Sequence, residues 1–319
     1  MDKENLPNAV FLMGPTASGK SQLALELSLR FPLEIVSVDS AQVYRGMDIG
    51  TAKPNASELA AVRHHLIDII DPTEAYSAAR FREEALGLIH DIESRNHLPL
   101  LVGGTMLYFK ALREGLSDLP QANAAIRAQI DREALDIGWH GLHAQLMKLD
   151  PKAGTRIKFG DTHRIQRALE IYRITGKTLS ALTLGKETHL APLRSLCLAL
   201  VPADRAHLHR RIAQRMQSMF NMGLIEELRQ LREQFALTAN MPSMRCVGYR
   251  QVWEHLEGEL GAEELLDRSI YATRQLAKRQ LTWIRSTPDA QVVDFADAAL
   301  ADKASALIEH FIAGNTGKN

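Results

Sequence analysis

The sequence predicts an α/β fold, in which helices cover a parallel sheet and a helical domain is inserted into the chain. Short apolar runs alternate with helix-length segments over the first 110 residues, which is the pattern of repeated βαβ units. The pattern stops at about Leu119 and resumes at Leu196. The chain has 319 residues, of which 45% are hydrophobic and 24% charged. This composition is sufficient for a globular core and excludes intrinsic disorder.

The strands are predicted where apolar runs end at turn residues. Runs without polar alternation are typical of strands buried on both faces of a sheet. Between the first two runs, residues 21–30 are expected to form a helix, with Leu23, Ala24 and Leu27 on one face. By these criteria we predict strands over residues 9–13, 34–38, 66–70, 98–102, 196–201 and 291–295.

The insertion is predicted from a change in this pattern. Residues 122–185 contain no run of strand type. They are expected to be helical, because glycine and Asp-Pro breaks divide them into helix-length segments. These breaks are Gly138, Asp150-Pro151, Gly160 and Gly176. We therefore predict a core of residues 1–119 and 196–319, and a helical insertion of residues 120–195.

Basic side chains are unevenly distributed, although the chain is neutral overall. Lys plus Arg and Asp plus Glu both total 38, a sum that by itself argues against a polyanionic partner. However, residues 268–285 contain five basic side chains and no acid, and residues 152–177 contain seven basic and two acidic ones. A run of charges is usually a solvated helix face, but such a face normally mixes both signs. The two stretches therefore indicate surfaces for a nucleic acid. A third acid-free run, residues 205–215, is assigned no role.

The cysteine content and the apolar runs indicate a cytoplasmic protein. Cys197 and Cys246 are the two cysteines, which excludes a disulfide framework and fits a reducing compartment. No apolar run approaches the roughly 18 residues that suggest a membrane span. Mixed charges in residues 1–5 argue against a signal peptide. We expect a cytoplasmic monomer with no membrane partner.

A complete phosphate-loop motif lies between the first strand and the first helix, which is the context that the motif requires. Its glycines let backbone N–H groups converge on phosphate oxygens, and the helix N-terminus adds a positive dipole end. Lys20 is expected to neutralise the terminal phosphate, and the Ser21 hydroxyl to bind Mg²⁺. The motif predicts a P-loop NTPase-like core and leaves open whether the phosphate is transferred, hydrolysed or expelled. The residues of this predicted site are Gly14, Pro15, Thr16, Ala17, Ser18, Gly19, Lys20 and Ser21.

Asp39 directly follows the second predicted strand. Ligands of open α/β sheets bind at this carboxyl edge, so Asp39 is a candidate Mg²⁺ ligand or general base. Asp is also favoured as a helix N-cap, and position alone does not separate these alternatives. Residues 49–54 follow as a loop with a lone lysine, which is ambiguous by itself.

Six blocks of sequence, taken in order, resemble the tRNA dimethylallyltransferases. These enzymes transfer an isoprenoid group from dimethylallyl diphosphate to the exocyclic amine of the adenosine beside the tRNA anticodon. The blocks span most of the chain, so the resemblance is specific. They are Gly-Pro-Thr-Ala-Ser-Gly-Lys at 14–20, Asp-Ser-Ala-Gln-Val-Tyr at 39–44, Ile-Gly-Thr-Ala-Lys-Pro at 49–54, Gly-Gly-Thr at 103–105, Arg-Cys-Val-Gly-Tyr-Arg-Gln at 245–251 and the block 275–285.

The resemblance implies a leaving-group role for the phosphate loop. Negative charge builds on the diphosphate as the allylic carbon–oxygen bond breaks, and Lys20, the loop N–H groups and Mg²⁺ on Ser21 would stabilise it. By the same resemblance, Asp39 is the general base for the adenine amine, and Thr105 lies near the reacting atoms. Taken from the sequence alone, Thr105 could simply end a strand-to-helix turn.

The resemblance also implies contacts with the tRNA anticodon stem-loop. The target adenine must be extruded from its stack to reach such a pocket. The residues at positions matching tRNA contacts of the family are Asp39, Ser40, Ala41, Gln42, Thr105, Arg127, His163, Arg164, Ile165, Gln166, Arg167, Arg245, Cys246, Val247, Gly248, Tyr249, Arg250, Lys278, Arg279, Gln280, Leu281, Thr282, Trp283, Ile284 and Arg285.

Three other functions are compatible with parts of this sequence. The phosphate loop alone favours a small-molecule or nucleoside kinase, which would consume ATP. A regulatory NTPase that binds RNA would show affinity for tRNA without covalent change. A prenyltransferase for free nucleotides shares the chemistry, but it would have no use for the insertion and the acid-free basic runs. We predict a Mg²⁺-dependent tRNA prenyltransferase.

Overall fold

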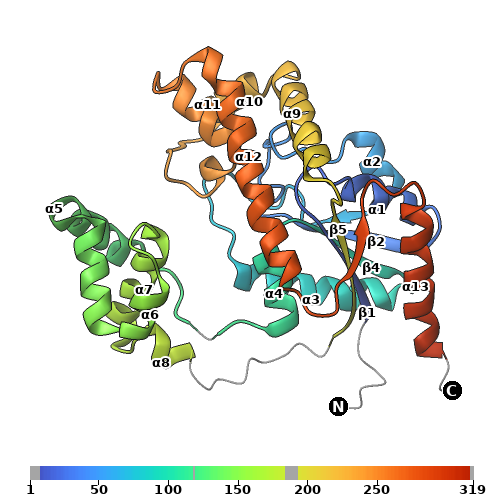
Figure 1. Ribbon diagram of the computed structural model, residues 1–319, viewed down its shortest axis with the longest axis horizontal. Coiled ribbons are helices and arrows are strands. Elements are labelled where there is room, and N and C mark those ends of the chain that lie inside the picture. The colour runs from blue at the N-terminus through green and yellow to red at the C-terminus, as the bar shows by residue number, and fades with distance from the viewer. Residues whose placement is uncertain (1–7, 118, 184–192, 317–319) are drawn as a thin grey trace. The chain divides into compact units, whose positions relative to one another are not determined.

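The computed structural model describes residues 8–117, 119–183 and 193–316. The chain divides into two compact units (Figure 1). The first comprises Met1–Arg113 and Ala191–Asn319, and the second comprises Glu114–Leu190. The second unit is the helical segment that we placed at residues 120–195, and its ends lie a few residues earlier in the chain.

The first unit is built on one parallel sheet of six strands in the order β3-β2-β4-β1-β5-β6. Every neighbouring pair is parallel, so the carboxyl ends of all strands meet at one edge. The strands are β1 (Asn8–Met13), β2 (Leu33–Val38), β3 (His64–His65), β4 (Leu98–Gly103), β5 (Arg194–Val201) and β6 (Gln291–Asp294).

The strand predicted over residues 66–70 is wrong, because β3 ends at His65. Leu66 and Asp68 have positive φ angles of 61° and 55°, which are incompatible with an extended strand. Leu66 and Ile70 are nevertheless buried, and Ile70 packs against the loop that follows β2. The Ile69 and Ile70 N–H groups donate to the Val43 carbonyl oxygen.

Helices cover both faces of the sheet (Figure 1). One core contains side chains of β1, β4 and β5 together with α1, α9, α12 and α13. The other core contains the opposite side chains of the same strands with α3 and α4. The helices are α1 (Lys20–Ser28), α3 (Ala78–Ser94), α4 (Met106–Glu114), α9 (Arg205–Asn221), α12 (Ala262–Arg285) and α13 (Leu300–Thr316).

A third core lies beyond the carboxyl edge of the sheet. It contains α10 (Leu224–Gln234), α11 (Tyr249–Leu256) and parts of α9 and α12, packed against the loop after β2 through residues such as Tyr44 and Met47. The short turn η2 (Ser243–Arg245) precedes α11. A small helix, α2 (Ala56–Ala61), begins at an Asn55 capping box.

The second unit contains α5 (Ala124–Leu149), α6 (Pro151–Arg156), α7 (Thr162–Thr175) and α8 (Leu179–Thr183). The breaks predicted in this segment are confirmed. Gly138 has a φ of 70° and interrupts α5, Asp150 caps α6, and Gly176 ends α7 in a left-handed conformation. The unit has a core of its own, which includes Ile130, Leu142 and Leu169.

Within the described residues, no helix combines the length and the apolar composition that crossing a bilayer requires.

Candidate active site

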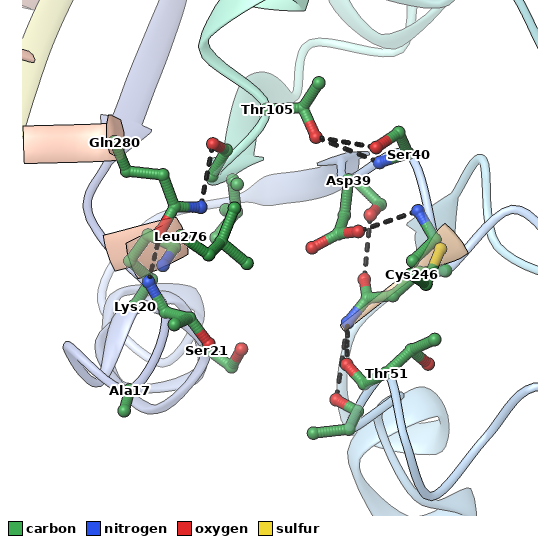
Figure 2. A pocket seen from close by; sticks show the side chains of 18 of the residues that line it. Ala17, Lys20, Ser21, Asp39, Ser40, Thr51, Thr105, Cys246, Leu276 and Gln280 are labelled. Atoms are coloured by element: carbon green, nitrogen blue, oxygen red, sulfur yellow. Dashed lines mark hydrogen bonds between the residues drawn. The ribbon is translucent and has the colours of Figure 1, made fainter. Parts of the chain in front are cut away.

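A cavity of about 550 Å³ lies at the carboxyl edge of the sheet, within the first unit. Figure 2 shows two groups of side chains facing it. We call the group around Lys20 the phosphate side, which comprises residues 16–21, Gln280 and also Arg215, whose charge acts on Lys20. We call the second group the carboxylate side, which comprises residues 39–42, residues 50–52, Thr105 and Cys246. All of these residues except Ser18 and Gly19 line the cavity itself.

The phosphate loop has the backbone conformation that its glycines predict. A Cβ atom on Gly14 would lie 2.6 Å from Ser18 Oγ and 3.2 Å from the Leu200 carbonyl oxygen, so a side chain does not fit there. Gly19 has a φ of 87° and precedes α1, a conformation that glycine adopts without strain. The loop therefore leads into the N-terminus of α1, where backbone N–H groups bind anions.

Lys20 is the cation at the centre of the phosphate side. Its Nζ donates to the Pro15 carbonyl oxygen at 2.8 Å. Burial and the neighbouring positive charge of Arg215 together lower the pKa of Lys20 to about 7, while Asp39 opposes the shift. A buried ammonium beside a second cation is stabilised by a bound anion, so this arrangement favours a phosphate ligand.

Arg215 is a cavity residue to which the sequence assigned no role. It lies on α9, lines the cavity, and has its pKa lowered by burial. Arg211, one turn earlier, places its Nη2 3.3 Å from where a Cβ on Gly19 would be, and its guanidinium stacks on the Phe295 ring at 5.3 Å. The sequence signal that could have identified this pair is their spacing of four residues, which places both arginines on one face of α9 beside its buried residues.

Gln280 connects α12 to the phosphate loop. Its Oε1 accepts a hydrogen bond from Thr16 N at 2.9 Å, and its Nε2 donates to the Gly104 carbonyl oxygen at 2.9 Å (Figure 2). Its side chain is 9% exposed. We expected Gln280 to contact tRNA, but both ends of its amide are used to hold the phosphate side.

On the carboxylate side, Asp39 ends β2 and starts a turn. Its Oδ1 accepts from Ala41 N at 2.8 Å, and its Oδ2 forms no hydrogen bond with any residue that the structure describes. The alternative that Asp39 caps a helix is wrong, because residues 40–43 form turns. The backbone therefore orients the carboxylate through Oδ1 and leaves Oδ2 available to a ligand.

Thr105 joins the ends of β4 and β2. Its Oγ1 accepts from Ser40 N at 3.0 Å and donates to Ser40 Oγ at 3.3 Å, and its own N–H donates to the Val38 carbonyl oxygen. A Cβ atom on Gly103 would lie 2.0 Å from that carbonyl oxygen. The Gly-Gly-Thr block thus lets the two strand ends approach closely and places a hydroxyl beside the turn at Asp39.

Gln42 and Lys53 hold the loop at residues 49–54. Gln42 Oε1 accepts from Ser37 Oγ at 2.8 Å, while Nε2 donates to the Thr51 and Ala52 carbonyl oxygens at 3.4 and 3.3 Å. The Lys53 ammonium, whose side chain is 4% exposed, pairs with Asp48 and Asp68. The ambiguous lysine is therefore structural.

The other predicted tRNA contacts of the first unit divide by burial. Those that line the cavity are Arg245, Cys246, Val247, Arg279 and Trp283. Those exposed outside it are Arg250, Lys278, Thr282 and Arg285. Tyr249, Leu281 and Ile284 are packed into hydrophobic cores, and Gly248 is buried. A consecutive block on a helix necessarily includes its buried face, and the assignment of these four to the tRNA-binding set stays a prediction.

The predicted contacts of the second unit surround a buried acid. Glu170 is fully buried and pairs with Arg127 at 2.9 Å and Arg167 at 2.7 Å. Burial opposes its ionisation, but hydrogen bonds from both arginines and from Asn123 N keep the pKa of Glu170 below its usual value. Gln166 donates to Asp131, and Arg164 pairs with Asp161. His163 and Arg164 are exposed, whereas Ile165 is a core residue of this unit.

No group of three or more His, Cys, Asp or Glu side chains in the described ranges could hold a metal ion. Ser21 lines the cavity at the start of α1, next to Lys20. A hydroxyl oxygen completed by ligand oxygens and waters is a donor that Mg²⁺ takes in phosphate sites. The described residues therefore fit Mg²⁺ held jointly with a phosphate ligand, but not a metal held by protein alone.

Comparison with known proteins identifies relatives along the whole chain. A tRNA dimethylallyltransferase of Chromobacterium violaceum is 56% identical over 309 residues, which cover 97% of this chain and 95% of the relative. A tRNA dimethylallyltransferase of Aromatoleum aromaticum is 58% identical over 283 residues, covering 89% and 88% of the two chains.

Solved structures show the same architecture. A tRNA isopentenylpyrophosphate transferase from Bacillus halodurans has a TM-score of 0.69 and 36% identity, covering 97% of this chain and 96% of that one. A eukaryotic dimethylallyltransferase acting on tRNA has a TM-score of 0.76 and 28% identity, covering 96% and 80%. The P-loop NTPase-like fold is thereby confirmed. Residues 42–287 match the family described as IPP transferase, and the chain belongs to this family.

Proposed function

We propose that this protein transfers the dimethylallyl group of dimethylallyl diphosphate to the exocyclic amine of the adenosine beside the tRNA anticodon, releasing diphosphate. The observation that carries the proposal is a single cavity with two opposed sides. A phosphate loop with Lys20 and Arg215 forms one side, and a carboxylate oriented by Ala41 N forms the other. The relatives named tRNA dimethylallyltransferase support the same reaction.

The phosphate side is suited to a leaving group. As the allylic carbon–oxygen bond breaks, its electron pair stays on the diphosphate. Backbone N–H groups, Lys20 and Arg215 then stabilise the added charge in a site partly withdrawn from water, where electrostatic stabilisation is largest. Mg²⁺ bound by the Ser21 hydroxyl and the diphosphate would supply further positive charge.

The carboxylate side is suited to a weak nucleophile. The adenine amine is weak because its lone pair is delocalised into the ring. Asp39 accepts a hydrogen bond from the amine, and takes the proton that leaves as the nitrogen–carbon bond forms. Thr105 and Ser40 hold the turn that carries Asp39, so they position the base. Atoms balance: the dimethylallyl group moves to nitrogen, diphosphate leaves, and one proton passes to Asp39.

The acceptor is a base extruded from a loop of RNA. Unstacked bases bind on aromatic rings and basic side chains. Arg245, Arg279 and Trp283 line the cavity and are exposed, so they can meet the backbone and bases around it. The exposed basic residues of the insertion, such as Arg164, would bind the stem. We propose a monomeric enzyme, working where tRNA occurs in the cytoplasm.

The direct test is incubation with tRNA, dimethylallyl diphosphate and Mg²⁺, followed by mass analysis of the digested nucleosides. The expected result is an adenosine heavier by one dimethylallyl group, with one diphosphate released for each modified base. Consumption of ATP with a phosphorylated product would instead indicate a kinase. Tight binding of tRNA without any covalent change would indicate an RNA-binding NTPase.

A further inference from the structure

One carboxylate outside the cavity joins the loop at residues 48–50 to the start of α11. Glu227 lies in the first turn of α10. Its Oε2 accepts from Asp48 N at 3.0 Å and Ile49 N at 2.7 Å, and its Oε1 accepts from Gly50 N at 3.3 Å. The Tyr249 hydroxyl donates to the same Oε1. Four donors from two distant segments therefore converge on one side chain that does not line the cavity.

The contact is close-packed as well as charged. Tyr249 is fully buried, and a Cβ on Gly50 would lie 2.5 Å from its ring and 2.8 Å from Leu224. Burial and the charge of Glu227 raise the pKa of Tyr249, so the phenol stays protonated and donates at every physiological pH. Gly50 thus presents its N–H to Glu227 because no side chain separates the loop from the tyrosine.

The loop held by Glu227 forms part of the cavity wall. Gly50, Thr51 and Ala52 line the cavity. The carbonyl oxygens of Thr51 and Ala52 accept hydrogen bonds from Gln42 Nε2. Gln42 lies three residues after Asp39 and also lines the cavity. The chain of contacts therefore runs from Glu227 through the loop to Gln42 and the turn that carries Asp39.

We propose that Glu227 is a positioning residue for the acceptor base. The role rests on the proposed function: Glu227 fixes the position of the loop that forms part of the carboxylate side. Gln280 holds the phosphate side through Thr16 N and Gly104 O. The two sides have separate supports. Loss of the Glu227 contacts should therefore change the reaction with tRNA and leave the binding of the diphosphate donor unchanged.

The first variants are Glu227→Gln, which keeps the shape but replaces one acceptor oxygen by an amide donor, and Tyr249→Phe, which removes one of the four donors. The matched control is Glu226→Gln on the same turn, whose carboxylate is exposed and pairs with Arg229. For Glu227→Gln we expect kcat/KM for tRNA to fall about 10- to 100-fold, since a small misplacement of a reacting group costs this much. Tyr249→Phe should show a smaller fall, and Glu226→Gln none.

A second readout separates positioning from a loss of folding. The KM for dimethylallyl diphosphate should stay at its wild-type value in Glu227→Gln and in Tyr249→Phe. The double variant should lose little more than Glu227→Gln alone, because both changes break the same contact. Equal changes in the donor KM and in kcat/KM for tRNA would overturn the proposal, as would wild-type turnover of both single variants. If wild-type protein forms no prenylated adenosine, the proposed function fails instead, which the parallel wild-type reaction reveals.

Discussion

The two sides of the cavity are built in different ways. The phosphate side is formed by one continuous loop at the start of α1, reinforced by Arg215 and Gln280 from two other helices. The carboxylate side is assembled from the ends of β2 and β4, the loop at 49–54 and the segment before α11. The difference follows from the ligands. Consecutive backbone N–H groups of one loop can bind phosphate oxygens, whereas a planar base and a proton acceptor need side chains placed from several directions.

Replacing the carboxylate itself should produce the largest effect. In Asp39→Asn the side chain keeps its size and its hydrogen bond from Ala41 N, but it loses the capacity to take a proton. We expect transfer to fall about 10²- to 10⁴-fold, the usual contribution of a general base. Single-turnover measurement of prenylated adenosine checks this. Asp302→Asn, at an exposed ion pair with Arg30, is the control, and near-normal transfer in Asp39→Asn would remove Asp39 from the mechanism.

On the phosphate side, Arg215→Met should weaken binding of the donor. Hydrogen bonds to charged groups contribute about 1.5–3 kcal/mol, so we expect affinity for dimethylallyl diphosphate to fall roughly 10- to 150-fold. The loss is partly offset, because removing this cation relieves the repulsion that lowers the pKa of Lys20. Calorimetric titration measures the affinity, with the exposed Arg210→Met on the same helix as control. Unchanged donor affinity would contradict the role of Arg215.

The pH dependence of donor binding should also distinguish the two sides. Burial and the charge of Arg215 together lower the pKa of Lys20 to about 7 in the free cavity, and a bound diphosphate raises it again. At a pH between the pKa of Lys20 in the free protein and its higher pKa in the complex, donor binding is accompanied by the uptake of one proton. Donor affinity should therefore fall about tenfold for each pH unit above 7. Below pH 7 Lys20 is already charged and this dependence disappears. Titrations in buffers of different ionisation enthalpy detect the proton. Lys20→Met should lack the lysine contribution, and equal proton uptake by Lys20→Met and wild type would refute the assignment.

The smallest effect is expected in the insertion, where exposed cations act singly. Arg164→Ala should weaken tRNA binding several-fold and lower the slope of log affinity against log salt by about 0.9, the value for one phosphate contact. Lys303→Ala, on α13, replaces a cation that pairs with Asp297 and should leave both quantities unchanged. Filter binding over a series of salt concentrations measures them. A slope that does not change in Arg164→Ala would place its side chain outside the RNA interface.

Much of the fold followed from local patterns. Buried parallel strands leave continuous apolar runs, so five of the predicted strands are confirmed. The run at 66–70 misled because Leu66 and Ile70 are buried in two different cores from an irregular segment with positive φ angles. Apolar composition records burial, and it does not record backbone conformation.

The site was predictable where its residues are consecutive. The phosphate loop and Asp39 lie where their motifs predicted. Arg215, Glu227 and the true partners of Gln280 were not found, because their roles depend on contacts across 177 residues for Glu227 and Gly50, and 264 residues for Gln280 and Thr16. Block resemblance also included Tyr249 and Leu281, whose side chains support the site from the core.

The separation of the two sides is tested most directly by calorimetry and single-turnover chemistry on one variant, Asp39→Asn. We predict that it binds dimethylallyl diphosphate with close to wild-type affinity, because the removal of a negative charge near the donor is offset by a further lowering of the Lys20 pKa, while prenylated adenosine fails to form from donor already bound. A parallel loss of donor affinity and transfer would show that Asp39 serves the phosphate side, and would contradict the division of the cavity into donor and acceptor sides.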